Sequence, residues 1–114
     1  MAAGPEGTWQ SESGETKVRI APCGADYCGT IVWAQDNGTD TMNPDPAKRA
    51  APLVGTQMIT RMKPSAGGFS GRLYNYKDGK TYSGKLQPIG NDRLKLSGCV
   101  MGVFCRSQIW TRAD

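Results

Sequence analysis

Hydrophobic and polar residues alternate in short runs along most of the chain, a period of two that is typical of β-strands with one buried face. The alternation is clearest at Lys17-Val18-Arg19-Ile20 and at Arg93-Leu94-Lys95-Leu96. Glycine, proline and other turn formers separate the runs at intervals of about ten residues. The pattern predicts strands over residues 7–11, 16–21, 29–34, 57–63, 93–100 and 106–112, with two more inside 68–88.

The alternation also predicts which side chains share a face of each strand. We expect Ile31 and Trp33 on one face of segment 29–34. In segment 57–63 we expect Met58, Thr60 and Met62 on one face.

A β-hairpin is expected at 68–88, where two strand-forming runs meet at Lys77-Asp78-Gly79-Lys80. Gly79 accepts the positive φ that a tight connection demands. If it is the left-handed residue of a three-residue loop, Tyr76 pairs with Lys80 and Tyr74 falls directly opposite Tyr82.

About eight strands are expected, and all but one of the connections between them are short. Consecutive strands are therefore expected to be antiparallel neighbours. This arrangement predicts an all-β fold, a small antiparallel up-and-down barrel whose ends pair to remove exposed edges. The length of 114 residues fits one domain. We expect the barrel over 7–112 and a disordered N-terminal remnant over 1–6.

The one long connection, 35–52, carries turn formers followed by a helix-start signal. Asp45 can cap the free N–H groups and Pro46 suits the first helical position. One short helix is therefore expected, ended by Pro52 and anchored by Leu53 and Val54. It could form a rim or lid of the barrel.

Four cysteines occur as two close pairs, Cys23 with Cys28 and Cys99 with Cys105. Their spacings are at or beyond the edge of those usual for paired metal cysteines, and the chain has no histidine, so two local disulfides are expected instead of a metal site. Disulfides persist outside the cytosol. Met1-Ala2-Ala3-Gly4 looks like an initiator methionine on a mature chain whose signal peptide ended in small residues. We therefore expect a periplasmic or secreted protein.

Enzymatic chemistry finds little support in the residue types present. Without histidine there is no usual base for a serine or cysteine nucleophile. The acids lie largely in predicted turns, where they act as turn and cap formers. No glycine has the strand-loop-helix context of a phosphate cradle. We therefore expect that the protein is not an enzyme and has no cofactor.

The net charge of +4 is spread along alternating strands, which favours a solvated face over a nucleic-acid surface. No apolar run approaches the roughly 20 residues of a membrane helix.

Several short motifs, in their order and spacing, are shared with a known family. The segments are Gly7-Thr8-Trp9, Ile20-Ala21-Pro22-Cys23, Cys28-Gly29-Thr30-Ile31-Val32-Trp33, Asn43-Pro44-Asp45-Pro46, Arg72-Leu73-Tyr74, Gly79-Lys80-Thr81-Tyr82, Leu96-Ser97-Gly98-Cys99 and Gln108-Ile109-Trp110-Thr111-Arg112. With them, residues 7–112 resemble the bacterial domain-of-unknown-function family 2147. The resemblance implies an exported bacterial protein with a lipocalin-like or fatty-acid-binding-protein-like barrel. The family has no established reaction or ligand. This chain departs from it in lacking the longer charged insertion that many members carry before Asn43.

A second resemblance concerns the barrel ends. Lipocalins carry a Gly-x-Trp on the first strand whose ring packs beside an arginine of the last strand, and Gly7-Thr8-Trp9 with Arg112 is similar. A guanidinium that packs on the face of an indole ring makes a cation-π interaction that contributes about 0.5 to 2 kcal/mol. We expect this pair to close the barrel.

The functional hint lies in soft and aromatic side chains on strands that flank the long connection. The candidate ligand-binding residues are Trp33, Met58, Met62, Tyr74 and Tyr82. Facing inward, they would line a cavity for a small apolar or amphipathic molecule. The alternative is that they fill a small core, because an eight-stranded barrel is just wide enough for either arrangement. Two further readings are a periplasmic interaction or inhibitor module acting through loops, and an oligonucleotide-binding barrel, which fits poorly with export.

Overall fold

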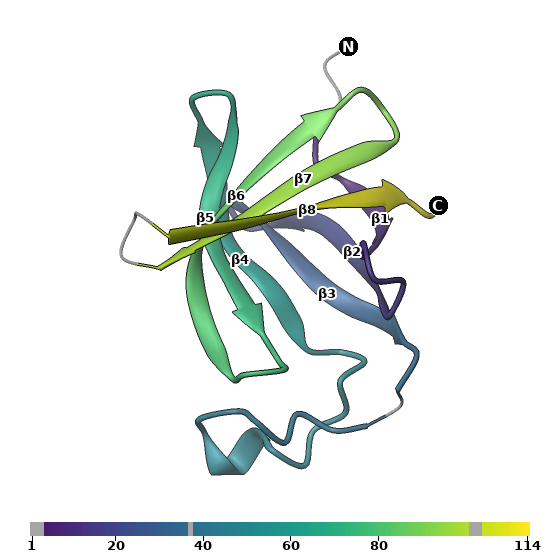
Figure 1. Ribbon diagram of the computed structural model, residues 1–114, viewed down its shortest axis with the longest axis vertical. Helices are drawn as coiled ribbons and strands as arrows, with labels where there is room; N and C mark the ends of the chain where they lie inside the picture. Colours follow the sequence, from purple (N-terminus) through teal and green to yellow (C-terminus); the bar gives the residue numbers. More distant parts are fainter. Residues whose placement is uncertain (1–3, 37, 101–103) are drawn as a thin grey trace.

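In the computed structural model, which describes residues 4–36, 38–100 and 104–114, eight antiparallel strands follow one another around a closed barrel (Figure 1). The strands are β1 Gly7–Gln10, β2 Thr16–Cys23, β3 Asp26–Ala34, β4 Gln57–Ser65, β5 Gly68–Asn75, β6 Lys80–Ile89, β7 Arg93–Val100 and β8 Phe104–Arg112. Each pairs with the next, and β8 pairs back onto β1. The lipocalin-like barrel predicted from the sequence is confirmed. Among the described residues no helix is long and apolar enough to cross a membrane.

The first and last strands meet at Trp9 and Arg112, as expected. The two residues are Cα partners in the β1–β8 pairing, and the guanidinium carbon lies 4.3 Å from the centre of the indole ring. The indole N–H donates to the Pro5 carbonyl at 2.9 Å. Pro5, which belongs to the segment 1–6 expected to precede the barrel, is itself buried, and residues 1–3 of that segment lie outside the described residues. Chain ends thus close the barrel through one packed cluster.

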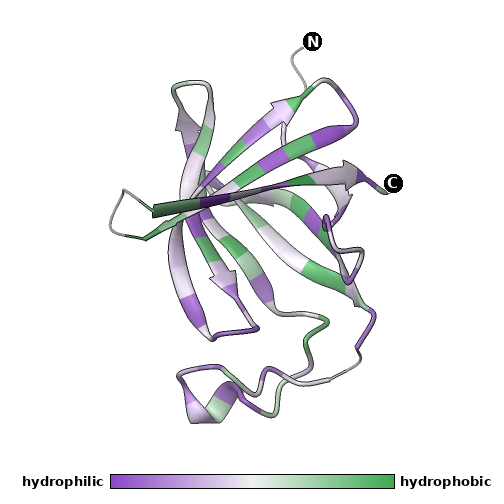
Figure 2. Ribbon diagram, viewed as in Figure 1, coloured by the Kyte–Doolittle hydropathy of each residue, from purple (hydrophilic) through white to green (hydrophobic). Residues whose placement is uncertain are grey.

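The core fills only one part of the barrel. Alternation of apolar and polar residues along the strands is visible in Figure 2. The buried apolar residues are Trp9, Val18, Ile20, Ile31, Ala34, Leu53, Ile59, Met62, Leu86, Leu94, Leu96 and Trp110. Tyr27 and Phe69, whose rings meet edge to face at 5.5 Å, pack against this cluster. They belong to the end of the barrel that carries the β2–β3 and β4–β5 turns.

Two irregularities reverse the predicted faces of β3 and β4. In β3 the register with β2 shifts between the pairs Val18↔Ile31 and Lys17↔Trp33, so Val32 is an extra residue. Such a bulge breaks the period of two. Trp33 therefore does not share the inward face of Ile31: its side chain is 43% exposed, and Lys17 Nζ lies 5.4 Å from its ring.

In β4 the register shifts between Thr60 and Lys63, and Arg61 there has a φ of 55°. Ile59 and Met62 consequently both point into the core, although they have opposite parity. Thr60 pairs with the exposed Arg72 and faces outward, whereas Met58 and Met62 both face the interior. The prediction that all three residues share one face is therefore wrong.

The β5–β6 hairpin forms where predicted, but its loop is one residue longer. Asn75 pairs with Lys80, which leaves residues 76–79 in the turn, with Gly79 at a φ of 72°. Tyr74 therefore lies opposite Thr81, and Tyr82 opposite Leu73. The predicted Tyr74–Tyr82 pair does not form, and the two tyrosines belong to opposite faces of the hairpin.

The described part of the long connection contains one 3-10 turn, Pro46–Lys48. The Asp45 carboxylate caps it by accepting from the Ala47 N–H at 3.0 Å. The turn is shorter than the helix predicted to run to Pro52. Leu53 is buried and anchors the connection as expected, whereas Val54 is exposed.

The disulfides form within each cysteine pair, as predicted. Cys23 joins Cys28 beside the β2–β3 turn, and Cys99 joins Cys105, its direct partner across β7 and β8. The connection expected at 101–103 lies outside the described residues.

Candidate ligand-binding cavity

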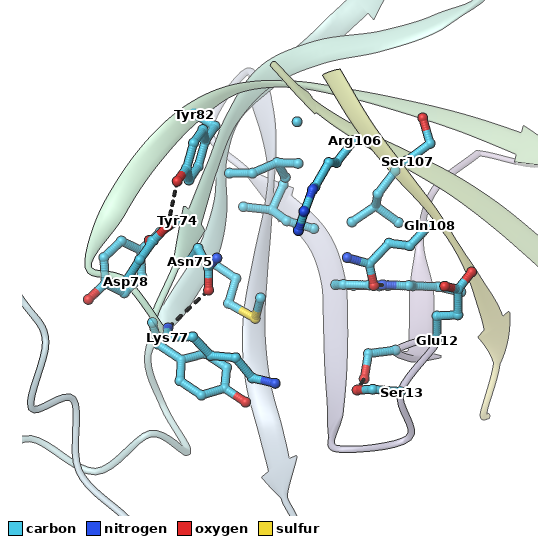
Figure 3. A pocket seen from close by; sticks show the side chains of 18 of the residues that line it. Glu12, Ser13, Tyr74, Asn75, Lys77, Asp78, Tyr82, Arg106, Ser107 and Gln108 are labelled. Carbon is cyan, nitrogen blue, oxygen red and sulfur yellow. Dashed lines mark hydrogen bonds between the residues drawn. The ribbon is translucent and has the colours of Figure 1, made fainter. Parts of the chain in front are cut away.

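A cavity of about 1050 Å³ lies in the end of the barrel that carries the β1–β2, β5–β6 and β7–β8 connections (Figure 3). Its deeper wall is apolar and includes Met58, Ile59, Leu73, Leu96 and Trp110. Its polar lining consists of Ser11, Glu12, Ser13, Thr16, Tyr74, Asn75, Tyr76, Lys77, Asp78, Tyr82, Arg106, Ser107 and Gln108. The barrel is therefore packed at one end and hollow at the other.

One wall of the cavity follows from the pairing of β7 with β8. Leu96 pairs with Gln108 and Gly98 pairs with Arg106, and all four belong to the cavity lining. Trp110 continues the same column deeper in the barrel and is only 2% exposed. Directly opposed residues share a face, so from Arg106 to Trp110 this wall changes from polar to apolar, and the apolar pair Val100 and Phe104 lies beyond Arg106.

Space in this wall depends on Gly98. A Cβ atom added there would lie 3.8 Å from the Tyr82 Cβ and 3.9 Å from the Leu73 Cδ1, ordinary van der Waals contacts. No backbone constraint requires glycine, because Gly98 is not among the glycines with positive φ. The missing side chain leaves room opposite Arg106.

A hydrogen bond from Trp110 fixes the orientation of the Gln108 side-chain amide. Trp110 Nε1 donates to Gln108 Oε1 at 2.7 Å. Because the indole is a donor only, the amide oxygen must be the acceptor of this bond. The Gln108 NH₂ group is thereby left as a donor on the cavity side.

Both candidate tyrosines direct their hydroxyl groups to carboxylates. Tyr82 donates to Asp78 Oδ2, and Asp78 Oδ1 also accepts from the Lys80 N–H at 2.9 Å. The bond to Asp78 raises the pKa of Tyr82. Burial acts to raise the pKa of Asp78, but the donated hydrogen bonds outweigh it and lower that pKa. The Tyr82 hydroxyl thus already donates its proton to another residue of the cavity lining.

Tyr74 ties the hairpin to the long connection. Its hydroxyl donates to Asp40 Oδ1 at 2.7 Å, and the other Asp40 oxygen accepts from Asn43 Nδ2 at 2.8 Å. Asp40 is only 2% exposed. Desolvation first, and the Asp40 carboxylate second, raise the pKa of Tyr74 to about 12.

Two turns meet across the cavity mouth through one ion pair. Lys77 Nζ of the β5–β6 turn lies 2.8 Å from Oε1 of Glu15, which precedes β2. The hydrogen bond from Lys77 lowers the pKa of Glu15, and the same bond raises the pKa of Lys77.

Three of the five predicted ligand-binding residues, Met58, Tyr74 and Tyr82, line the cavity. Met62 is fully buried and is not part of the lining, and Trp33 lies on the outer face because of the β3 bulge. The mouth also differs from the expected position near Asp45, since none of the described residues of 35–36 and 38–56 lines the cavity.

The residues that sequence reasoning missed are Glu12, Arg106, Gln108 and Trp110. The alternation Phe104, Arg106, Gln108, Trp110 holds the signal, because one face of β8 contains two polar residues between aromatic ones. Polar side chains that alternate along a strand predict a solvent-facing surface. Arg106 and Gln108 do face solvent, but the solvent of the cavity at the hollow end of the barrel.

The lining combines apolar and polar side chains. Among the described residues no group of three or more acidic or cysteine side chains is placed to hold a metal ion. The cavity offers an apolar depth, a mouth that is polar except at Val100 and Phe104, and a few donors of fixed direction. In small-molecule sites of proteins, a few placed polar groups on an apolar lining fix the orientation of the ligand.

Comparison with known proteins places this geometry in context. A family described as "Uncharacterized protein conserved in bacteria (DUF2147)" matches residues 7–112. Protein HP1028 from Helicobacter pylori, whose structure is described as belonging to the lipocalin family, is similar over 99% of this chain and 85% of its own. The identity is 19% and the TM-score is 0.86, so the likeness concerns the fold. No curated protein matches the chain.

Proposed function

The chain belongs to the DUF2147 family of uncharacterized bacterial proteins, and on this premise we propose that it is a non-enzymatic barrel that binds a small apolar or amphipathic molecule in its hollow end. The observation that carries the proposal is the cavity of about 1050 Å³ with an apolar depth and a polar mouth. Small-molecule sites are concave, mostly apolar and of about 300 to 1,000 Å³. The lining by Met58, Tyr74 and Tyr82 supports the same function.

Location outside the cytosol belongs to this proposal. The two disulfides support a periplasmic or secreted protein, because such bonds persist in oxidising compartments. Fractionation of the natural host, with thiol labelling of the recovered protein, tests this. Four free cysteines, or recovery with the cytosol, would contradict export.

A neutral fluorescent probe, N-phenyl-1-naphthylamine, tests binding in the cavity. We expect saturable binding to the folded protein that decan-1-ol displaces. The variant Met58→Asp should abolish it, because Met58 lines the apolar depth and an unpaired charge there opposes an apolar guest. The matched control is Thr81→Asp, at an exposed position of β6. Absence of saturable binding by the wild type, or equal loss in both variants, contradicts the proposal.

A second candidate function is a protein-interaction module acting through the outer surface. The β3 bulge supports it by exposing two adjacent apolar side chains, Val32 at 44% and Trp33 at 43%. Exposed apolar neighbours are a feature of interaction sites. Photo-crosslinking from position 33 in the native compartment, followed by a binding measurement with the purified partner, tests this candidate. A Trp33→Ser variant that binds such a partner unchanged contradicts it.

A further inference from the structure

We propose that the ligand of this cavity carries an anionic head group, which binds to the Arg106 guanidinium while its apolar tail extends toward Trp110. This inference deepens the proposed function, on which it rests, by naming the charge and the orientation of the ligand. The chemistry is that of an oxyanion, a carboxylate or a phosphate, on an apolar chain.

Arg106 lies on the cavity side of β8. It pairs with Gly98 of β7, and both residues line the cavity. Figure 3 shows its side chain in the space between Tyr82 and Gln108. Because Gly98 has no side chain, the position opposite the guanidinium is free for a guest.

The charge of Arg106 has no carboxylate partner among the described residues. The ion pairs within 4.0 Å there join Lys63 to Asp26, Lys77 to Glu15 and Arg112 to Asp114. Lys77, the other cation of the lining, is therefore already paired. Arg106 is the cation of the lining that remains available to a ligand.

The two acidic residues of the lining, Glu12 and Asp78, are both occupied. Glu12 Oε1 accepts from the Ile109 N–H at 2.9 Å. Asp78 accepts from the Tyr82 hydroxyl and from the Lys80 N–H. Each carboxylate thus accepts at least one hydrogen bond from the protein, and the titration with decylammonium described below tests whether either one also binds a cation.

Gln108 supplies a second donor beside Arg106. Its oxygen is held by the indole of Trp110, which leaves its NH₂ group to donate. In Figure 3 the Gln108 amide and the Arg106 guanidinium extend into the same part of the cavity. The planar fork of a guanidinium matches the two oxygens of a carboxylate or phosphate, and the amide can bond a remaining lone pair.

The strand also sets the direction of the ligand. Arg106 and Trp110 are four residues apart on β8, a distance of about 13 Å at the usual rise of a strand. Between them the wall changes from polar to apolar, with Leu96 opposite Gln108. The head therefore lies nearer the mouth and the tail toward the packed core.

Calorimetric titration with four ten-carbon probes tests the proposal: decanoate, decyl phosphate, decan-1-ol and decylammonium. We expect one or both anions to bind at least about tenfold more tightly than decan-1-ol, the factor for a charge-assisted hydrogen bond of about 1.4 kcal/mol. The tighter of the two anions identifies the head group. Decylammonium should bind most weakly.

Two cavity variants and one control locate the effect. Arg106→Gln should lose about tenfold in affinity for the anions and leave decan-1-ol binding unchanged within about twofold. Gln108→Glu keeps the oxygen that accepts from Trp110 but removes the NH₂ donors, so it should weaken anion binding in the same selective way. Arg72→Gln, at an exposed position of β5, should change neither.

The outcomes separate this inference from the proposed function. If no probe binds, the proposed function fails. If decan-1-ol binds as tightly as the anions, or if Arg106→Gln weakens all probes equally, the cavity binds ligands but the anion site is wrong. Tightest binding of decylammonium also overturns the anion site.

Discussion

Lys77 Nζ lies 2.8 Å from Glu15 Oε1, and this ion pair joins the β5–β6 turn to the segment that leads into β2, across one side of the cavity mouth. The two residues are 62 positions apart in the chain. Their side chains are 57% and 40% exposed, so water screens the attraction. The pair therefore serves to hold two turns together locally more than to stabilise the whole fold.

The first prediction concerns this pair. Lys77→Met should leave the free energy of unfolding at neutral pH nearly unchanged, because exposed ion pairs contribute little. It should instead speed amide hydrogen exchange in the turn at 11–16, which opens locally. Lys77→Arg, which keeps the charge, is the matched control. Equal exchange rates in Lys77→Met and wild type would show that the pair does not hold the turns.

The pH dependence of that effect has a definite sign. The pKa of Glu15 is lowered in the folded protein, so the contribution of the pair is present above the ordinary pKa of a glutamate and is lost as pH falls through the lowered value. The pKa of Lys77 is raised, so the contribution is lost again as pH rises through that value. The difference between Lys77→Met and wild type should disappear at both extremes.

The second prediction concerns barrel closure. Trp9→Ala should lower the free energy of unfolding by about 3 to 5 kcal/mol, the usual cost of deleting a buried aromatic side chain. Arg112→Ala should cost less. Because the guanidinium lies 4.3 Å from the indole centre, the two losses should not add in the double variant. Denaturant unfolding of the four proteins measures the coupling, and strict additivity would contradict a direct role of the contact.

Much of the fold was predictable because its determinants are local. Alternation at 17–20 and 93–96 identified β2 and β7, and Gly79 marked the β5–β6 turn. Closure was predictable from the resemblance of Gly7-Thr8-Trp9 and Arg112 to the lipocalin ends. The cysteine spacing was sufficient for both disulfides, because each pair flanks a turn.

The errors come from single inserted residues that the alternation does not reveal. The bulge at Val32 moves Trp33 to the outside, and the left-handed Arg61 turns Met62 into the core. One extra residue in the β5–β6 loop changes the cross-strand partner of Tyr82 from the predicted Tyr74 to Leu73. Each shift depends on how neighbouring strands pair, which is a non-local property.

The candidate site was partly predictable for the same reason. Met58, Tyr74 and Tyr82 stand out as soft or aromatic residues, and they do line the cavity. Arg106 and Gln108 resemble any polar residues on a strand that faces water. Only the structure of the closed barrel, which is hollow at one end, shows that Arg106 and Gln108 face a cavity.

The third prediction concerns Tyr74, whose hydroxyl donates to the buried carboxylate of Asp40. Tyr74→Phe should lower the free energy of unfolding by about 1 to 3 kcal/mol, because a buried acceptor loses a donor. Tyr76→Phe is the control, since Tyr76 is also a half-buried tyrosine of this hairpin. Equal, small losses in both variants would show that the bond to Asp40 contributes nothing special.

Alkaline titration tests the same contact independently. The pKa of Tyr74 is raised to about 12, so the folded state holds this proton more tightly than the unfolded state does. Its contribution to stability is complete below about pH 10, the ordinary tyrosine value, and declines as pH rises toward 12. The ultraviolet absorbance of tyrosinate, compared between wild type and Tyr74→Phe, should show one late-titrating group missing in the variant.

The last prediction uses two glycines that face each other across β6 and β7. Gly98→Ala should keep or slightly raise stability, by up to about 1 kcal/mol, because the added Cβ meets only ordinary contacts and restricts the unfolded chain. Gly84→Ala should lower stability by about 1 to 3 kcal/mol, because its Cβ would collide with the Leu73 side chain. Denaturant unfolding of both variants therefore tests the packing of this row.

A larger residue at position 98 then tests the cavity itself. Gly98→Leu should fold, since the space opposite Arg106 can receive a side chain, but it should weaken binding of N-phenyl-1-naphthylamine by taking up part of the cavity along this wall. Ser83→Leu, at an exposed position of β6, adds the same apolar group outside and should leave probe binding intact. A folded Gly98→Leu protein that still binds the probe with wild-type affinity would show that the probe does not lie against this wall of the cavity, because an added side chain there must displace any guest that contacts it.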